Sequence, residues 1–181
     1  MESKFSYKIV VIGDPAVGKT SLIYKYTKGH FKEDYIQTIG AQLSKYETKI
    51  NTNVLCQIVL WDIAGQDTFH FLRPAFYKGS QAAIIVYSLE KSEHGKMSLE
   101  HVDEWYNDLM DYCGVMPTVL LGNKLDLIDY KESIDKKAVK MVEKRDFIGY
   151  YRTSAKTGEG VIAAFQAIIQ ELYNKYSQMN C

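Results

Sequence analysis

Runs of apolar residues recur along this chain of 181 residues, and the segments between them space their apolar positions as helices do. Six apolar or alternating runs have the length and composition of strands: residues 5–12, 43–50, 54–61, 82–87, 117–122 and 147–152. The second and third runs are separated by Asn-Thr-Asn, a composition typical of turns, so they predict a hairpin.

Helical spacing is clearest at Val102, Trp105 and Leu109, which follow one another at i, i+3 and i+7. They predict an amphipathic helix over about residues 97–112, preceded by a charged loop over residues 89–96. Further helices are predicted over about residues 20–27, 73–79 and 161–176, and after a Ser133 cap with the apolar face Ile134, Ala138, Met141 and Val142.

The alternation of strands and helices predicts an α/β protein with a six-stranded, mostly parallel sheet. About five helices are expected to cover both faces of this sheet, because the apolar runs read as strands that are buried on both sides. The hairpin places one antiparallel strand at an edge. No repeat or linker divides the sequence, so residues 1–181 are expected to form a single domain.

Composition narrows the class of protein. Lysine plus arginine and aspartate plus glutamate number 22 each, so the net charge is zero and no surface for nucleic acid is indicated. The three cysteines, Cys56, Cys113 and Cys181, lack C-x-x-C spacing and are expected to be reduced thiols rather than zinc ligands. No apolar run reaches the roughly 20 residues of a membrane span, and no signal peptide precedes the first strand, so we expect a cytoplasmic protein.

Residues 13–20 read Gly-Asp-Pro-Ala-Val-Gly-Lys-Thr and match the phosphate-loop pattern G-x-x-x-x-G-K-[ST] between a predicted strand and a predicted helix. Glycines let backbone N–H groups close around a phosphate, and the helix terminus adds its positive dipole end. Lys19 is expected to reach the β- and γ-phosphates, and the Thr20 hydroxyl to ligate Mg²⁺. A chance glycine-rich turn is the plainer interpretation of the pattern.

Three further polar clusters follow predicted strands, namely Asp62, residues 123–126 and residues 153–156. Ligands of open α/β sheets bind where the carboxyl ends of strands meet, so these clusters are expected to converge on the phosphate loop. This convergence indicates a nucleotide site more strongly than any single motif.

The residues after the third strand suggest metal binding and hydrolysis. Asp62 is interpreted as a carboxylate that holds Mg²⁺ through water, although a turn aspartate is the plainer alternative. Gly65 allows its N–H to approach a γ-phosphate, and the amide of Gln66 can orient an attacking water. A surface glutamine without a role is the alternative for Gln66.

The sequence Asn-Lys-Leu-Asp at residues 123–126 bears on the choice of base. Guanine presents N1–H and its 2-amino group side by side, and the carboxylate of Asp126 can accept both hydrogen bonds. Lys124 can lay its aliphatic stem over the purine, and the Ala155 N–H can donate to guanine O6. Either cluster alone can be an ordinary loop, but both together after a phosphate loop favour a guanine nucleotide.

The motifs at residues 13–20, 61–66, 123–126 and 153–156, together with Thr38, resemble the Ras superfamily of small GTPases over nearly the whole chain. Within it, residues 34–40, 76–80 and 82–87 are similar to segments of the Rab branch. The resemblance implies the three-layer P-loop NTPase fold of small G proteins. It also implies a switch that binds GTP and GDP with Mg²⁺ and slowly hydrolyses GTP, in vesicle trafficking or related signalling.

The resemblance assigns roles that the residues alone do not. Thr38 is similar to the threonine whose hydroxyl ligates Mg²⁺ and whose N–H meets the γ-phosphate, and Phe31 to the aromatic that packs against guanine. The implied catalytic residues are Gln66, Lys19 and Thr38, and the implied metal ligands are Thr20, Thr38 and, through water, Asp62. The implied nucleotide contacts are Gly13, Asp14, Pro15, Ala16, Val17, Gly18, Lys19, Thr20, Ser21, Phe31, Tyr35, Thr38, Gly65, Asn123, Lys124, Asp126, Ser154, Ala155 and Lys156.

The same resemblance implies two nucleotide-dependent segments, switch I at about residues 31–40 and switch II at about residues 64–79. Their expected partners are a nucleotide exchange factor, a GTPase-activating protein and effectors, which bind a monomer. Leu43, Trp61 and Phe76 fall where Rab proteins carry an apolar triad read by effectors, although a packing role explains them equally well.

Several positions depart from the Rab pattern. Pro15 replaces a usual glycine or serine, has no N–H and has a fixed φ. Asp67, Thr68 and Ser88 also differ from common Rab residues, which leaves the partners open. The chain ends at Cys181, where Rab proteins continue to two prenylated cysteines, so either the chain is truncated or it has no lipid anchor. Peripheral membrane attachment is expected only with a lipidated tail.

Two other functions remain open at this point. A P-loop ATPase or kinase would share the phosphate loop, but Asp126 and the Ser-Ala-Lys segment at residues 154–156 argue against it. A scaffold that holds GTP without cycling is the second alternative, for which Pro15 leaves some room.

Overall fold

The protein is described by a computed structural model that covers residues 3–31, 38–51, 54–129 and 135–177. Within these residues a six-stranded sheet has the order β2-β3-β1-β4-β5-β6. The strands are β1 (Ser3–Ile12), β2 (Ala41–Asn51), β3 (Val54–Ile63), β4 (Ala82–Ser88), β5 (Thr118–Asn123) and β6 (Gly149–Arg152). All neighbouring strands are parallel except β2 and β3, which form the predicted hairpin with β2 at the edge.

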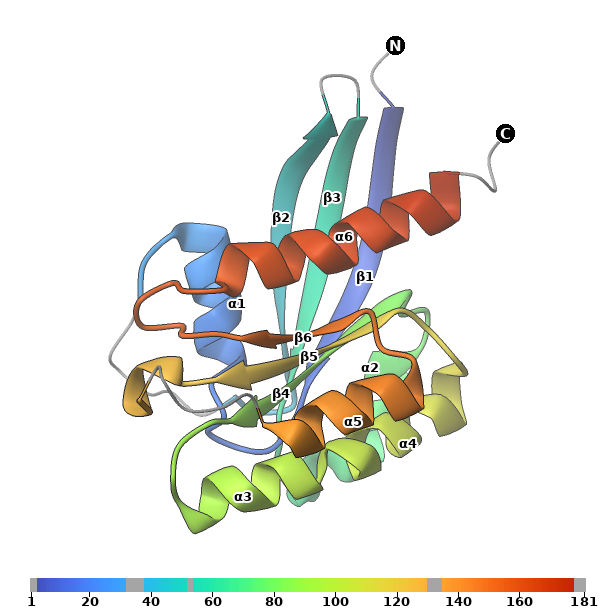
Figure 1. Cartoon of the computed structure of the whole chain (residues 1–181). Helices are drawn as coiled ribbons and strands as arrows, with labels where there is room; N and C mark the ends of the chain where they lie inside the picture. Colours follow the sequence, from blue (N-terminus) through green and yellow to red (C-terminus); the bar gives the residue numbers. More distant parts are fainter. Residues whose placement is uncertain (1–2, 32–37, 52–53, 130–134, 178–181) are drawn as a thin grey trace.

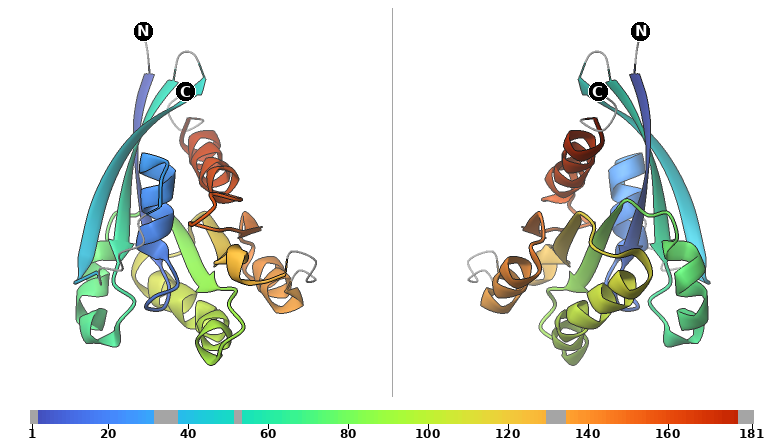
Figure 2. Two further views of the ribbon diagram at one scale, coloured as in Figure 1. Left: turned by 90° about the vertical axis from the view of Figure 1, so that its left-hand side faces the viewer. Right: turned by 90° about the vertical axis from the view of Figure 1, so that its right-hand side faces the viewer.

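Helices cover both faces of this sheet (Figures 1 and 2). They are α1 (Lys19–Lys28), α2 (Arg73–Tyr77), α3 (Glu93–Glu100), α4 (Val102–Cys113), α5 (Lys136–Arg145) and α6 (Val161–Ser177), with 3₁₀ turns η1 (Asp67–Leu72) and η2 (Leu125–Leu127). Helices α1 and α6 pack on one face, and α2 to α5 supply the buried residues of the other. The predicted fold class, a mostly parallel α/β sheet with an antiparallel edge strand, is confirmed.

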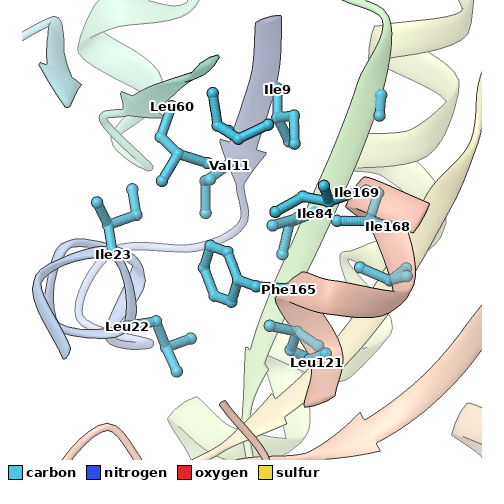
Figure 3. Packing of buried hydrophobic residues seen from close by; sticks show 14 of the residues in the cluster. Ile9, Val11, Leu22, Ile23, Leu60, Ile84, Leu121, Phe165, Ile168 and Ile169 are labelled. Atoms are coloured by element: carbon cyan, nitrogen blue, oxygen red, sulfur yellow. The ribbon is translucent and has the colours of Figure 1, made fainter. Parts of the chain in front are cut away.

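Two apolar cores lie on opposite faces of the sheet because successive strand residues point to opposite sides. In β1, Ile9 and Val11 belong to the core under α1 and α6, while Val10 and Ile12 belong to the other. Figure 3 shows Phe165 of α6 among the side chains of the first core. Burial on both faces explains why the inner strands read as continuous apolar runs.

The prediction of a charged loop over residues 89–96 is wrong in its second half, because α3 begins at Glu93. The side chain of Ser92 accepts a hydrogen bond from the Gly95 N–H at 3.1 Å and caps the helix. A single residue, His101, joins α3 to α4, so the amphipathic helix predicted from residue 97 starts about one turn earlier.

Other boundaries differ by smaller amounts. Strand β3 continues through Asp62 to Ile63 instead of ending before the carboxylate. Helix α5 is capped by Asp135, whose carboxylate accepts hydrogen bonds from the Lys137 and Ala138 N–H groups. The predicted cap, Ser133, lies outside the described residues. None of the helices in the described ranges has the length and apolar character that crossing a bilayer requires.

Candidate nucleotide-binding site

The loops that follow β1, β3, β5 and β6 surround one cavity of about 680 Å³. The cavity is lined by fifteen predicted site residues: Pro15, Ala16, Gly18, Lys19, Thr20, Ser21, Phe31, Thr38, Gly65, Gln66, Asn123, Lys124, Asp126, Ala155 and Lys156. Four other lining residues, Tyr24, Gln42, Ala64 and Leu127, were not predicted as nucleotide contacts, although Ala64 belongs to the predicted switch II. Tyr35 lies outside the described residues.

Strand register brings these loops together. Val11 of β1 lies opposite Asp62 of β3, so the metal-type carboxylate sits beside the start of the phosphate loop. On the other side, Gly122 of β5 pairs with Arg152 of β6, which places the next residues, Asn123 and Thr153, side by side. The convergence predicted from strand ends is therefore present in the fold.

Two glycines let the phosphate loop lie close to its neighbours. Gly13 has φ 138°, and a Cβ there would lie 2.1 Å from the Val86 carbonyl oxygen. Gly18 has φ 98°, and a Cβ would lie 2.3 Å from the amide nitrogen of Asn123. This space lets the Asn123 side chain donate a hydrogen bond to the Val17 carbonyl at 2.9 Å. Side chains at either glycine would push the loop away from the sheet.

The Lys19 ammonium lies under the loop and is almost completely buried. It donates hydrogen bonds of 2.7 Å to each of the carbonyls of Gly13 and Asp14. Burial lowers the pKa of Lys19 to about 8, and attraction to Asp62 and Asp14 opposes that shift. The site therefore contains a buried cation whose charge an anionic ligand would stabilise.

Asp62 joins the two predicted metal-binding threonines. Its Oδ2 accepts hydrogen bonds from the hydroxyls of Thr20 and Thr38, which themselves lie 3.1 Å apart. Its Oδ1 is buried and has no hydrogen-bond partner among the described residues. Burial raises the pKa of Asp62, while the Thr20 hydrogen bond and the Lys19 charge lower it.

An unpartnered buried carboxylate oxygen costs free energy unless a ligand satisfies it. Asp62 Oδ1 and the hydroxyls of Thr20 and Thr38 are hard oxygen donors of the kind that Mg²⁺ prefers. The described residues contain no group of three or more His, Cys, Asp or Glu side chains suited to a metal. The residues at Asp62 thus fit a magnesium ion that takes its other ligands from phosphate and water.

The base side of the cavity is held by a network of buried hydrogen bonds. Oδ1 of Asn123 accepts from the Thr153 hydroxyl at 3.3 Å and from the Ala155 N–H at 3.1 Å. The Ser154 hydroxyl donates to Asp126 Oδ1 at 2.5 Å. Ser154 does not line the cavity, so its role is to position Asp126 and not to contact a ligand itself. The Ala155 N–H, expected to donate to guanine O6, is directed at Asn123 in this structure.

Asp14 is turned away from the cavity, although the sequence predicted it as a nucleotide contact. Its carboxylate accepts hydrogen bonds from the Trp105 indole at 2.8 Å and from His101 Nδ1 at 2.7 Å. Its backbone carbonyl oxygen instead accepts a hydrogen bond from the ammonium of Lys19. Sequence periodicity placed Trp105 on an apolar helix face and gave no sign of this polar contact.

The segment after β3 packs directly against the phosphate loop. A Cβ at Gly65 would lie 2.4 Å from the backbone of Asp14 and Pro15, so this close approach requires glycine. Gln66 lines the cavity one residue later.

The three predicted effector residues form one group. Leu43 pairs with Trp61 across the hairpin, and the Trp61 ring lies 5.9 Å from that of Phe76. Ile39 and Phe71, which the sequence analysis did not single out, are exposed by 79% and 73%. Ile39 directly follows Thr38, which lines the cavity, so at least this exposed apolar residue lies beside the cavity.

The parallel sheet, the phosphate loop between β1 and α1, and the base-side loops after β5 and β6 define a P-loop nucleotide-binding protein. The sequence model of the Ras family matches residues 8–174. The chain belongs to the Ras family of small GTPases and is most like its Rab branch.

Several curated relatives carry Rab names. The chain is 34% identical to the Ypt/Rab-type GTPase ypt7 of Schizosaccharomyces pombe, over 92% of this chain and 82% of the relative. It is 35% identical to the Ras-related protein Rab7 of Drosophila melanogaster, over 89% and 77%. It is 33% identical to the Ras-related protein Rab-1 of Theileria annulata, over 98% and 79%.

Proposed function

We propose that this protein is a Rab-like molecular switch that binds GTP and GDP with Mg²⁺, slowly hydrolyses GTP and acts in vesicle trafficking. The observation that carries the proposal is that one cavity combines residues suited to phosphate and metal with residues suited to a guanine base. Lys19, Thr20 and Asp62 gather at the end of β1 and β3, while Asn123 and Asp126 gather at the end of β5. The Rab names of the relatives support the trafficking role.

Guanine recognition rests on Asp126. Ser154 holds one oxygen of its carboxylate, which leaves the group oriented at the cavity wall. The carboxylate accepts hydrogen bonds from guanine N1–H and the 2-amino group, whereas adenine would leave it unpaired. Asn123 fixes the adjoining loops, and Lys124 covers the purine with its stem.

Phosphate binding and hydrolysis use the opposite end of the cavity. Thr20, Thr38 and Asp62 would hold a magnesium ion, which would offset the negative charge of the phosphates. Lys19 stabilises the same oxygens from below, and Gly65 brings backbone N–H groups close to the loop. Gln66 orients a water for in-line attack on the γ-phosphate.

The switch itself consists of residues 31–40 and 64–79, of which residues 32–37 lie outside the described part of the chain. Contacts from Thr38 and Gly65 to a γ-phosphate favour one arrangement, and hydrolysis removes them. Effectors then distinguish the two states on the surface around Leu43, Trp61 and Phe76. An exchange factor and an activating protein, which can add about 10³–10⁵ to the rate, set the cycle in a cytoplasmic monomer.

Single-turnover hydrolysis of bound GTP with Mg²⁺ tests this proposal, with Gln66→Leu compared with the native chain. Slow turnover in the native chain and a fall of about 10²-fold or more in Gln66→Leu are expected, because the water loses its orienting amide. Gln170→Leu is the matched control, since Gln170 is exposed on α6, which supplies no residue to the cavity.

The competing functions give different results in the same preparation. Preferential retention of ATP over GTP in competition would support an ATPase or kinase. Tight GTP binding without hydrolysis in either form would support a scaffold, and Pro15→Gly would then test whether the proline at the cavity wall is the cause.

A further inference from the structure

Two side chains outside the cavity, Glu90 and His94, connect the phosphate loop to the base-side loop. His94 Nε2 lies 2.8 Å from the Pro15 carbonyl oxygen, and His94 Nδ1 lies 2.8 Å from Glu90 Oε1. The other carboxylate oxygen of Glu90 lies 3.2 Å from the Lys124 ammonium. Pro15 and Lys124 both line the cavity, whereas Glu90 and His94 do not. One histidine and one carboxylate thus link two walls of the nucleotide site.

The first turn of α3 is built to hold this link. Ser92 caps the helix, and Glu90 and His94 stand four residues apart across its start. A Cβ at Gly95 would lie 2.1 Å from the Glu90 carbonyl oxygen and 3.2 Å from Glu90 Cγ. Glycine at position 95 therefore lets Glu90 fold back against the helix, where its carboxylate meets both His94 and Lys124.

Both contacts of the His94 ring are made to oxygen atoms of other groups. Its Nε2 faces the backbone carbonyl of Pro15 and its Nδ1 faces the carboxylate of Glu90, which places the ring between the phosphate loop and Glu90. Burial raises the pKa of Glu90, but hydrogen bonds from His94 and Lys124 outweigh it and hold that pKa below its usual value. The carboxylate of Asp14, the nearest acid of the phosphate loop, is bonded to His101 and Trp105 instead.

We propose that Glu90 and His94 are positioning residues for the nucleotide, which hold Lys124 over the base and Pro15 at the phosphate loop and thereby slow nucleotide release. The inference rests on the proposed function of the cavity. Both residues act through others, because neither lines the cavity or contacts the Thr20, Thr38 and Asp62 cluster. The link therefore affects release and leaves the hydrolytic step unchanged.

Release of N-methylanthraniloyl-GDP from Mg²⁺-loaded protein measures the effect directly. Glu90→Gln and His94→Gln are each expected to release it about tenfold faster than the native chain, as for loss of one interaction of a coupled network. The double variant is expected to match the singles, because either change already breaks the same link. Glu93→Gln is the matched control, since it removes an exposed carboxylate from the same helical turn.

A further readout separates positioning from a general loss of structure. Single-turnover GTP hydrolysis is expected to stay within about twofold of native in every variant, because Gln66 and the metal cluster are untouched. A general loss of structure would instead lower the hydrolysis rate together with nucleotide retention.

Several outcomes would overturn the inference while the proposed function stands. These are release rates for Glu90→Gln and His94→Gln within twofold of Glu93→Gln, fully additive effects in the double variant, or hydrolysis rates that fall in parallel with nucleotide retention. If one variant does not fold, the other single variant still decides the release rate. Failure of the native chain to retain guanine nucleotide would instead refute the proposed function, and the inference with it.

Discussion

The two ends of the nucleotide cavity are built differently. At the base end, Asn123, Thr153 and Ser154 are 0–1% exposed, and their side chains bond to one another or to neighbouring backbone. At the phosphate end, Asp62 is equally buried, but one of its carboxylate oxygens has no partner among the described residues. The buried polar side chains of the base end therefore have hydrogen-bond partners within the protein, whereas the phosphate end has a buried oxygen that a ligand would satisfy.

This difference indicates that the two ends of the cavity have different roles, one in recognising the base and the other in responding to the phosphates. A fully bonded wall recognises the same base in every state of the protein, because its groups cannot rearrange without losing hydrogen bonds. The buried oxygen of Asp62 that has no partner among the described residues gains stability when a ligand satisfies it. The switching part of the molecule is therefore expected at the Asp62 end, where the exposed Ile39 follows Thr38, a hydrogen-bond partner of Asp62.

Among changes at the base end, Asp126→Asn is expected to weaken nucleotide binding most. The amide presents a donor where guanine also donates, so affinity for GDP is expected to fall by about 10³-fold or more. Competition binding against native protein measures the change, with Asp111→Asn, an exposed aspartate of α4, as control. An affinity within tenfold of native would show that Asp126 does not read the base.

Asp62→Asn tests the phosphate end. In the native chain, removing Mg²⁺ with a chelator is expected to speed GDP release by about 10²-fold, because a metal held by Thr20 and Asp62 would offset the charge of the bound phosphates. The variant should release GDP at one fast rate with or without the chelator. If the chelator leaves the rate of GDP release from the native chain unchanged, the proposed magnesium site is wrong.

The support of the phosphate loop is tested by Trp105→Phe, which keeps an aromatic, though smaller, ring and removes the donor to Asp14. Loss of a hydrogen bond to a buried carboxylate is expected to lower the free energy of unfolding by about 1.5–3 kcal/mol in urea denaturation. Trp61→Phe is the comparison, because the Trp61 ring contacts Phe76 and Lys8 rather than a buried acid. Equal effects of the two changes would mean that the Asp14 bond contributes little.

The pH dependence of binding tests the buried cation. Burial lowers the pKa of Lys19 to about 8, so the ammonium loses its proton as the pH rises through that value. A bound diphosphate raises this pKa, so GDP binding above about pH 8 takes up a proton and weakens by up to about tenfold per pH unit. Calorimetry in two buffers of different ionisation enthalpy at about pH 9 measures the uptake. Binding without proton uptake at that pH would show that Lys19 keeps its charge.

Much of this arrangement follows from local sequence. The motif at residues 13–20, the hairpin and the position of Asp126 after its strand depend on short-range patterns, and the fold places them as those patterns indicate. Asp62 lies near the carboxyl end of its strand, although β3 continues one residue past it. Two features that lie between distant segments were missed. The Asp14–Trp105 bond spans 91 residues, and the His94 bond to Pro15 spans 79.

The start of α3 could be predicted from the sequence. Ser92 stands three residues before Gly95 and carries a capping signal at the level of sequence, although charged neighbours favoured a loop. The orientation of Asp14 had no such signal, because a carboxylate in a phosphate loop can face either the ligand or a neighbouring helix. Only packing of α4 against the loop decides between them.

Amide hydrogen exchange, compared between the GDP-bound protein and the protein bound to a non-hydrolysable GTP analogue, tests the central claim most directly. The account predicts that protection differs at residues 38–40 and 62–79 but not at residues 119–126 or 149–155, where hydrogen bonds are complete within the protein. Equal changes at both ends of the cavity, or none at either end, would contradict the division between a fixed base wall and a responsive phosphate wall.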